Sequence, residues 1–283
     1  MPDTVMPAET VTRVRTLAAL RHAVATLRAG GATIGFVPTM GALHDGHLAL
    51  VKKAKAVCDK VVVSIFVNPL QFAPTEDLER YPRTEAADIA LLHSVGCDLV
   101  YLPTPDALYP ADFVSRIDMQ GPALGLETDF RPHFFAGVTT VVMKLFNQVQ
   151  PDIAVFGEKD YQQLAVIRTM VRDFDMRLDI VGYPTVREPD GLALSSRNAY
   201  LSGEERAVAP RINQALRTIA AATDPDTAIV TAKAELNAAG FGPIDYVAVR
   251  DAATLGPVRD GEPRRILAAL WLGKTRLIDN IAA

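Results

Sequence analysis

The stretch TIGFVPTMGALHDGHLALVKKAKAVCDKVVVSIFVN, residues 33–68, predicts the centre of the fold. It begins with a short apolar run at 33–39, continues through a helix-like segment at 47–57, and ends in a densely β-branched run at 60–68. Neither apolar run alternates with polar residues, which is typical of strands that are covered on both faces. A strand, a helix and a strand in this order predict a right-handed βαβ crossover and a parallel sheet.

The same alternation continues along the chain. Residues 83–96 indicate a helix that ends at Gly96, and residues 97–103 indicate another buried strand. After an irregular stretch from about 103 to 135, helix-like segments at 137–149 and 160–174 alternate with strand-like segments at 152–157 and 177–186. About five strands alternating with helices predict a doubly wound, Rossmann-like α/β domain.

The pattern changes beyond about residue 187. Alanine-rich, helix-like segments at 203–223 and 226–240 are followed by strand candidates at 244–251, 264–272 and 274–281. This order predicts a smaller α+β unit. We therefore expect two domains, 1–186 and 187–283, with the boundary near REPDGLALSSRN at 187–198.

Composition narrows the classes of function. The 283-residue chain is 49% hydrophobic and 22% charged, as in a folded globular protein. With a net charge of −4 it offers no basic surface to nucleic acid or an anionic membrane, so an anionic substrate needs a local group of donors. Cys58 and Cys97 form no metal-binding pair, and we expect reduced, buried thiols. No signal peptide is evident and no run reaches the ~18 apolar residues of a membrane span, which predicts a cytoplasmic protein.

Residues 38–47, PTMGALHDGH, lie where the first strand of the βαβ unit ends and its helix begins. Ligands of open α/β sheets bind beyond the carboxyl ends of the strands. Gly41 and Gly46 let the backbone turn sharply and approach a ligand, and the helix N-terminus offers unpaired N–H groups. His44 and His47 add two side-chain donors on one face of the first turn. This favours a nucleotide phosphate, while a zinc pair and ordinary polar turn residues stay open as alternatives.

A second polar cluster, FGEKDYQQL at 156–164, again joins a strand end to a helix start. Lys159 supplies a point cation for phosphate oxygens. Asp160 is a plausible helix N-cap. Gln162 and Gln163 fall in the first turn, where we expect them to face the crevice as amide donors and acceptors.

A third cluster, GLALSSRN at 191–198, lies on the connection between the two predicted domains. Ser195, Ser196 and Arg197 supply more donors than helix capping needs, so we predict that they point to phosphate. Ser202, a few residues later, is interpreted as a helix N-cap.

The segment WLGKTRLID at 271–279 contains Gly-Lys-Thr but does not fit a phosphate loop. That loop needs a glycine five residues before the Gly-Lys pair, where this chain has Ala268, and it must precede a helix. We interpret Gly273 and Lys274 as a hairpin turn.

In combination, PTMGALHDGH, FVNPLQF, FGEKDYQQL and LSSRN, in this order and spacing, resemble the pantoate–β-alanine ligase family of the HxGH nucleotidyltransferase superfamily. The resemblance extends from about residue 13 to 280. It implies an ATP-dependent, magnesium-requiring ligase of pantothenate (coenzyme A) biosynthesis that works in two steps. Pantoate first attacks the α-phosphorus of ATP to give pantoyl adenylate and pyrophosphate, and the amine of β-alanine then expels AMP.

The resemblance also implies roles for individual residues. His47, in the position of the family's proton donor, acts with His44 and Lys159 in catalysis, and the small C-terminal domain serves as a lid. Gln71 and Gln163 match the pantoate-binding glutamines, and we expect Asn68 to face the same pocket. Asp88 matches a position near the metal, although on a helix it could equally be a solvated surface charge. ATP is implied along Met40, Gly41, His44, Gly46, His47, Gly157, Glu158, Lys159, Asp160, Val186, Leu194, Ser195, Ser196 and Arg197.

The chemistry of the residues suggests a narrower role for the histidines. Pantoate is already a carboxylate, so adenylation requires no proton transfer. We therefore interpret His44 and His47 as groups that stabilise charge at the reacting phosphates.

One loop departs from the family pattern. The family shows Arg-Pro, a small residue and then His-Phe, whereas this chain reads RPHFFAGV at 131–138. Arg131 keeps its place, but Phe134 occupies the usual histidine position and His133 the small-residue position. The family is dimeric, which implies a homodimer here.

The sequence is also compatible with rival functions. An HxGH adenylyltransferase would transfer AMP to a phosphorylated cofactor precursor and would need no amine. A tRNA synthetase is disfavoured because no basic anticodon-reading domain follows. A non-catalytic nucleotide sensor and a zinc-binding module are rivals from another class.

Overall fold

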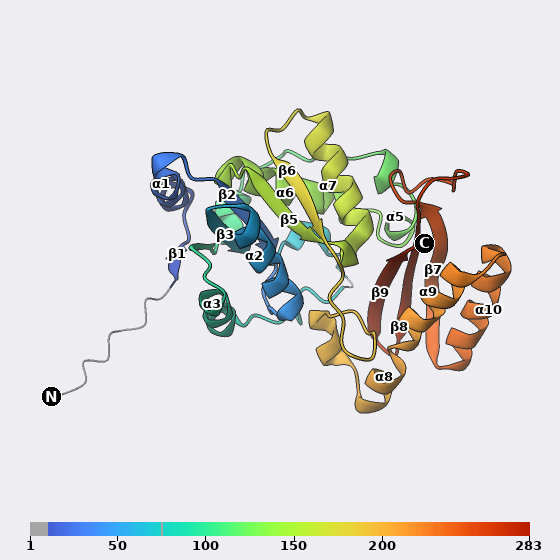
Figure 1. The fold of residues 1–283 in the computed structure, drawn as a ribbon. Coiled ribbons are helices and arrows are strands. Elements are labelled where there is room, and N and C mark those ends of the chain that lie inside the picture. The colour runs from blue at the N-terminus through green and yellow to red at the C-terminus, as the bar shows by residue number, and fades with distance from the viewer. Residues whose placement is uncertain (1–10, 75) are drawn as a thin grey trace.

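The computed structural model describes residues 11–74 and 76–283. Its larger domain is built on a six-stranded, wholly parallel sheet in the order β1-β4-β3-β2-β5-β6 (Figure 1). The strands are β1 (Thr12–Val14), β2 (Ile34–Thr39), β3 (Lys60–Ile65), β4 (Leu99–Tyr101), β5 (Ile153–Gly157) and β6 (Asp179–Tyr183). The predicted doubly wound α/β architecture is therefore confirmed.

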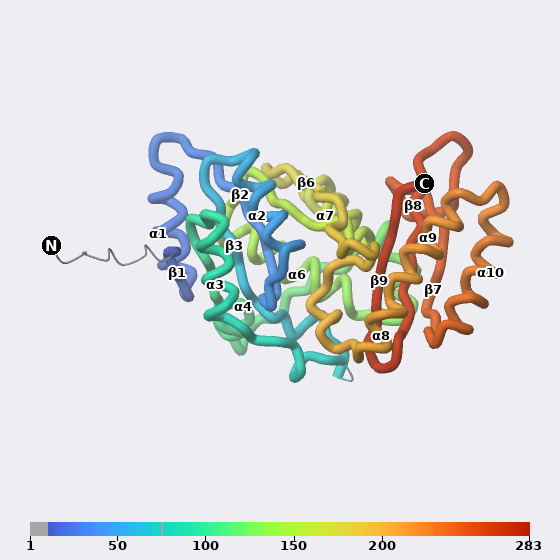
Figure 2. The backbone as a smooth tube through the Cα atoms, turned by 60° about the horizontal axis from the view of Figure 1, so that its bottom comes forward, coloured from blue at the N-terminus to red at the C-terminus, as the bar shows by residue number. Residues whose placement is uncertain are grey.

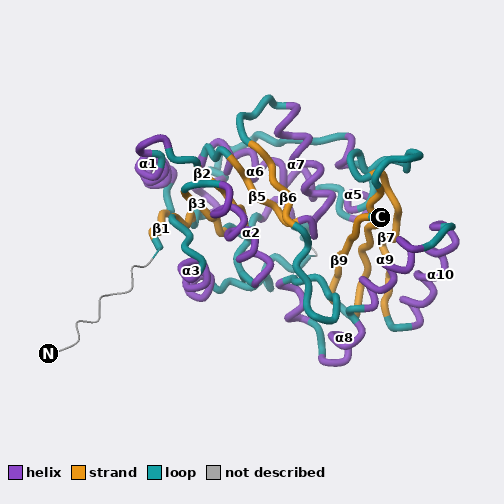
Figure 3. Tube along the Cα trace, viewed as in Figure 1, coloured by secondary structure: helices purple, strands orange, loops and turns teal. Residues whose placement is uncertain are grey.

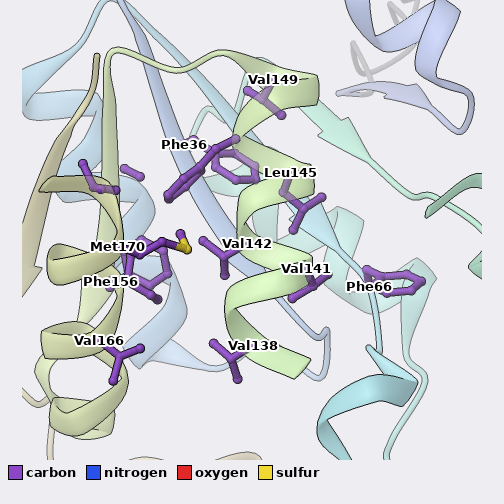
Figure 4. Packing of buried hydrophobic residues seen from close by; sticks show 14 of the residues in the cluster. Phe36, Phe66, Val138, Val141, Val142, Leu145, Val149, Phe156, Val166 and Met170 are labelled. Atoms are coloured by element: carbon purple, nitrogen blue, oxygen red, sulfur yellow. The ribbon is translucent and has the colours of Figure 1, made fainter. Parts of the chain in front are cut away.

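Helices cover both faces of this sheet. On one face lie α1 (Leu17–Leu27), α6 (Phe134–Val149) and α7 (Tyr161–Asp173), and on the other α2 (Asp45–Val57) and α3 (Glu85–Ser94). Successive residues of β2 enter different cores, since Phe36 packs with α6 and α7 whereas Val37 packs with α2. Figure 4 shows Val142 of α6 and Met170 of α7 in the core that surrounds Phe36. This two-sided burial explains why the strand sequences are continuously apolar.

Two elements at the start of the described chain are absent from the sequence prediction. The edge strand β1 has only three residues, two of them exposed, so it carries no hydrophobic pattern. Helix α1 follows it, with its buried face formed by Leu20 and Val24. The sheet accordingly has six strands rather than about five. The irregular stretch predicted from 103 to 135 contains only the short helices α4 (Pro105–Leu108) and α5 (Glu127–Phe130), the 3₁₀ turn η3 (Gly121–Ala123) and the start of α6.

The C-terminal part is the predicted smaller α+β unit. Its antiparallel sheet has the order β7-β8-β9, formed by β7 (Phe241–Asp251), β8 (Arg264–Leu272) and β9 (Thr275–Ala282). Helices α9 (Arg211–Ala221) and α10 (Pro225–Ala238) pack on it through a separate core. The helix-like segment at 203–223 is interrupted at Pro210, so a short α8 (Gly203–Val208) precedes α9.

The two sheets stand apart and are joined by the segment from 184 to 202 (Figure 3). Of the C-terminal strands, β9 lies nearest the larger domain, where it contacts the turns η4 (Glu158–Asp160) and η5 (Ser196–Tyr200) (Figure 2). The boundary at residues 186 and 187 stays a prediction. Cys58 and Cys97 are free and buried. Within the described part of the chain, no helix has both the length and the apolar character to cross a membrane.

Candidate active site

A cavity of about 1060 Å³ lies beyond the carboxyl ends of β2 and β5 and is lined by both domains. These strands are neighbours, and the chain leaves β2 toward β3 and β5 toward β6, in opposite directions along the sheet. Such a switch point is where open α/β sheets bind ligands. Of the predicted site residues, the wall contains Met40, His44, Gly46, His47, Asn68, Gln71, Gly157, Lys159, Asp160, Gln162, Gln163, Val186, Leu194, Ser195, Ser196 and Arg197.

The two histidines form the start of α2. His44 is the N-cap residue, and its Nδ1 accepts the backbone N–H of Gly46 at 3.2 Å. His47 lies in the first turn, and its Nδ1 accepts the backbone N–H of His44 at 3.3 Å. The ring centroids are 4.1 Å apart. Because each Nδ1 is an acceptor, each neutral ring carries its proton on Nε2, which is left to donate to a ligand.

Both imidazoles are neutral at physiological pH. Burial, assisted by the positive charge of Lys159, lowers the pKa of His44 to about 4. Burial also lowers the pKa of His47 to about 3, and His44 and Lys159 add to the effect. Neutral Nε2–H groups suit the charge-stabilising role better than the proton-donor role.

No group of three or more His, Cys, Asp or Glu side chains suited to a metal ion occurs in residues 11–74 and 76–283, so the zinc alternative lacks a ligand set.

Asp88 is not a surface charge, because its side chain is buried and lies outside the cavity wall. Its carboxylate accepts the backbone N–H groups of Ala42 at 3.0 Å and Leu43 at 2.8 Å, together with the hydroxyl of Thr84 at 3.2 Å. Gly41, also outside the wall, has a φ of +84°, and a Cβ there would meet Asp88 at 3.1 Å. These contacts argue against a metal ligand at Asp88 and correct its role to holding the turn that carries the histidines.

The loop after β5 presents Lys159 to the cavity. The side-chain amide of Asn280 donates to the carbonyls of Glu158 at 2.9 Å and Lys159 at 2.8 Å. Arg265 donates to the Glu158 carboxylate at 3.2 Å, and Glu158 lies outside the wall, so its predicted place along ATP is not supported. The Lys159 ammonium has no ion-pair or hydrogen-bond partner among the described residues. The C-terminal domain therefore fixes the backbone of this loop and leaves the cation to a ligand.

Three capping interpretations have different outcomes. Ser202 is the N-cap of α8 and forms a capping box with Glu205, which confirms the prediction. Asp160 occupies the N-cap position of α7, but its side chain makes no capping hydrogen bond. Ser195 caps η5 by accepting the backbone N–H of Arg197 at 3.3 Å. Ser195 also lines the cavity, and its predicted role toward phosphate stays a prediction.

Arg197 is already paired within the protein. Its Nε and a terminal nitrogen donate to the Asp77 carboxylate at 3.1 and 2.9 Å, and Asp77 outweighs the effect of burial to raise the pKa of Arg197. The hydroxyls of Tyr81 and Ser196 lie 3.4 Å apart in the wall. The predicted phosphate donors thus meet in one place, but the Arg197 guanidinium offers only its remaining N–H groups.

Gln71 reaches the cavity from the turn η2 (Pro69–Gln71). Its Oε1 accepts the amide of Asn68 at 3.1 Å, and its Nε2 donates to the sulfur of Met40 at 3.2 Å. Asn68 also donates to the carbonyl of Gly137 at 3.2 Å and accepts the hydroxyl of Tyr109 at 2.8 Å. Asn68 therefore orients Gln71, and its own amide is fully engaged.

The two neighbouring glutamines of α7 have separate roles. Both residues line the cavity, as predicted. The Gln162 amide donates to the carbonyls of Pro122 at 3.0 Å and Gly125 at 3.1 Å and accepts the N–H of Glu127 at 3.1 Å. Gln162 therefore faces the crevice as predicted, but its amide holds the segment from 122 to 127 and is not free for a ligand.

The atypical RPHFF loop places a phenyl ring where the family has an imidazole. Phe134 lines the cavity, and the Arg131 guanidinium lies 3.9 Å from its ring centroid. Arg131 donates two hydrogen bonds to Glu76, at 2.8 and 2.7 Å. His133 lies outside the wall, with its Nε2 buried and 4.0 Å from Glu76. The shifted histidine thus does not replace the missing imidazole.

Sequence reasoning missed a charged cluster that joins the domains. Arg276 of β9 donates to Glu127 of α5 through two hydrogen bonds of 2.9 Å and to Asp245 of β7 at 2.7 Å. The Tyr246 hydroxyl donates to Glu127 at 2.8 Å. These residues line the cavity but belong to no local motif, so no signal in the sequence brings them together.

Comparison with known proteins decides the family. The family model described as pantoate-beta-alanine ligase matches residues 12–282. The chain belongs to the pantoate–β-alanine ligase family. It is 55% identical to the pantothenate synthetase of Mesorhizobium japonicum, with 95% of this chain and 96% of the relative covered. The pantothenate synthetase of a Bradyrhizobium species is 56% identical, with coverage of 95% and 97%.

Solved structures of the family have the same fold. Pantothenate synthetase from Thermus thermophilus superposes with a TM-score of 0.89 at 45% identity, covering 96% of this chain and 99% of that one. Pantoate-beta-alanine ligase from Francisella tularensis, described as complexed with beta-gamma ATP and beta-alanine, gives a TM-score of 0.84 at 36% identity, with coverage of 96% and 97%. This pantoate–β-alanine ligase chain is therefore an enzyme of the carbon–nitrogen ligase class.

Proposed function

We propose that the cavity condenses pantoate with β-alanine at the expense of ATP, giving pantothenate, AMP and pyrophosphate. The observation that carries the proposal is the convergence of two neutral imidazole Nε2–H groups and the Lys159 ammonium at the switch point of the sheet. Gln71 and Gln163 line the same cavity and supply amides for the hydroxyls and carboxylate of pantoate.

In the first step a pantoate carboxylate oxygen attacks the α-phosphorus of ATP, and the bond from that phosphorus to pyrophosphate breaks. The barrier is electrostatic, because two anions must meet while charge builds on the leaving group. Preorganised donors in a buried site lower such a barrier most effectively. His44, His47 and Lys159 supply two neutral donors and one cation without requiring a proton transfer.

In the second step the β-alanine amine attacks the acyl carbon of pantoyl adenylate, and the carbon–oxygen bond to AMP breaks. The amine loses a proton as the amide forms, and that proton passes to the departing AMP phosphate or to solvent. Gln71 and Gln163 would hold the pantoyl group through both steps, since its position changes little between them. Asn68 contributes by fixing the Gln71 amide.

Magnesium is implied by the family, and the wall contains one side chain that suits it. The Asp160 carboxylate makes no hydrogen bond to its own helix and lines the cavity beside Lys159. Mg²⁺ is commonly held by one or two carboxylates together with substrate phosphates. Asp160 would therefore hold the ion, which when bound neutralises phosphate charge.

We also propose the 1–186 and 187–283 division with the second domain as a lid, a homodimer, and a cytoplasmic location. The joining segment from 184 to 202 and the walls contributed by both domains support the lid. The free, buried state of Cys58 and Cys97 agrees with a reducing compartment.

The test is isotope exchange between ATP and pyrophosphate. Exchange that depends on pantoate and does not need β-alanine supports an adenylate intermediate. Exchange with phosphopantetheine or a mononucleotide in place of pantoate would instead favour the adenylyltransferase rival. Binding of ATP with no exchange under any of these conditions would favour the nucleotide sensor.

Replacement of Gln71 by alanine is expected to raise the apparent KM for pantoate by about 10-fold or more, because each lost hydrogen bond to an ionic partner costs about 1.5–3 kcal/mol. The KM for ATP should change much less. Steady-state kinetics with each substrate varied in turn measures both. The matched control is Gln214→Ala on α9, outside the cavity wall. Equal increases in both constants would mean that Gln71 is not a pantoate ligand.

A further inference from the structure

The Gly-Lys-Thr turn of the C-terminal sheet lies at the cavity, although it is not a phosphate loop. Gly273 and Lys274 connect β8 and β9 as the predicted hairpin, with Leu272 paired to Thr275. Both turn residues line the same cavity as His47, Lys159 and Ser196. The C-terminal sheet therefore contributes a lysine to the wall of this cavity.

The surroundings of the hairpin place it beside the serine cluster. Gly273 has a φ of +56°, and a Cβ at that position would collide with the Glu205 carboxylate of α8. Figures 1 and 2 both show α8 next to the end of the sheet where β8 meets β9. Strand β9 also contacts η5, which begins at Ser196. Lys274, which precedes the first residue of β9, thus lines the same cavity as the Ser195 and Ser196 hydroxyls that we assign to phosphate.

Lys274 differs from most other cationic side chains of the cavity wall in having no carboxylate partner. Arg131 is paired with Glu76, Arg197 with Asp77, and Arg276 with Glu127 and Asp245. Arg80 lies 5.5 Å from the ring centroid of Tyr200. Within the described chain, the Lys159 and Lys274 ammonium groups have neither a carboxylate within ion-pair distance nor a hydrogen-bond partner. The two lysines line one cavity from different domains, and Lys274 is exposed.

We propose that Lys274 binds the β- and γ-phosphates of ATP and the pyrophosphate that leaves, from the side opposite Lys159. This inference rests on the proposed function. The proposed role of Lys274 is confined to adenylation. As the pantoate oxygen bonds to the α-phosphorus, the bond from that phosphorus to pyrophosphate breaks and its electron pair passes to pyrophosphate. Lys274 neutralises the charge that pyrophosphate gains. The later attack of β-alanine releases AMP and involves no pyrophosphate.

The experiment separates the two half-reactions in the full-length enzyme. Pyrophosphate release from ATP and pantoate is measured by rapid quench without β-alanine. Enzyme that has accumulated pantoyl adenylate, with pyrophosphatase present, is then mixed with β-alanine and the pantothenate burst is followed. Lys274→Ala should slow the first reaction by about 10- to 100-fold, as expected for loss of a bond to a charged group, and leave the burst rate unchanged. Lys274→Arg should restore most of the first rate, and Lys233→Ala on α10, outside the wall, should match wild type.

Each result has a distinct meaning. An unchanged first half-reaction in Lys274→Ala overturns the inference, and so does an equal loss in both half-reactions, which would indicate a structural role. A wild-type enzyme without pantoate-dependent pyrophosphate release overturns the proposed function together with the inference. A normal wild type beside an unaffected Lys274→Ala variant overturns the inference alone.

Discussion

Replacement of His47 by alanine is expected to remove about 2–4 kcal/mol of transition-state stabilisation, read from kcat/KM for pantothenate formation. The reason is geometric, because the Nδ1 of this buried ring is held by the backbone N–H of His44 at 3.3 Å and its Nε2–H is left for the phosphates. A fixed neutral donor in a site that excludes water stabilises developing charge without reorganising. The loss should appear in the adenylation half-reaction.

The control for this variant is His22→Ala. His22 is an exposed histidine on α1 and does not line the cavity. Thermal unfolding of both variants checks that α2 still forms after the capping contact is lost. Unchanged turnover in His47→Ala would exclude the residue from the mechanism.

The pH dependence offers an independent check of the neutral state. With a pKa of about 4 for His44 and about 3 for His47, these rings stay neutral as the pH falls through 6.5, the usual value for histidine. Neither ring should therefore cause a loss of kcat/KM near pH 6.5. A decline at that pH that disappears in His47→Ala would contradict the neutral assignment.

The sequence predicts those parts of the fold and site that depend on residues close together in the chain. The apolar strands β2 and β3, the helix between them and the two polar loops after β2 and β5 all follow from patterns a few residues long. The position of both loops at one edge then follows from the parallel sheet. The short, exposed strand β1 lacks such a pattern, so the sequence does not predict it.

The remaining features depend on contacts between distant segments. Asp88 matches a motif position near the metal, yet its carboxylate is bound by the backbone of residues 42 and 43, which no spacing rule indicates. Asn68 and Gln162 line the cavity as predicted, but the amide of each is engaged within the protein by residues distant in the chain, which no local pattern indicates. The motif around Lys274 fails the local test for a phosphate loop, and only the tertiary fold brings this lysine to the cavity.

Replacement of Arg276 by alanine is expected to lower the free energy of unfolding by about 3–5 kcal/mol at pH 7. The Glu127 and Asp245 side chains that Arg276 joins are each only 8% exposed. The variant therefore removes the ion-pair partner of buried Asp245 and leaves buried Glu127 with Arg131 alone, at 3.5 Å. Breaking a buried pair in this way costs far more than losing an exposed one. The effect should also loosen the contact between α5 and the C-terminal sheet. Urea unfolding followed by circular dichroism measures the change.

The matched control is Arg206→Ala, which removes an ion pair to Asp190 whose partners are 35% and 42% exposed, and should cost about 0–1 kcal/mol.

The loss of unfolding free energy in Arg276→Ala should depend on pH, and this dependence distinguishes a contribution from charge from one due to packing. In the wild type, burial opposes ionisation of Glu127, but attraction and hydrogen bonds from Arg276 outweigh it and lower the pKa. That stabilisation is present above the pKa of the unfolded chain and is lost as the pH falls through the folded value. Without Arg276, only Arg131 and the Tyr246 hydroxyl oppose the effect of burial on the pKa of Glu127, so the carboxyl takes up a proton at a higher pH than in the wild type. The difference in free energy of unfolding between the wild type and Arg276→Ala should therefore become smaller as the pH is lowered from 7. A difference of the same size at every pH would mean that Arg276 stabilises the protein by packing and not by neutralising buried charge.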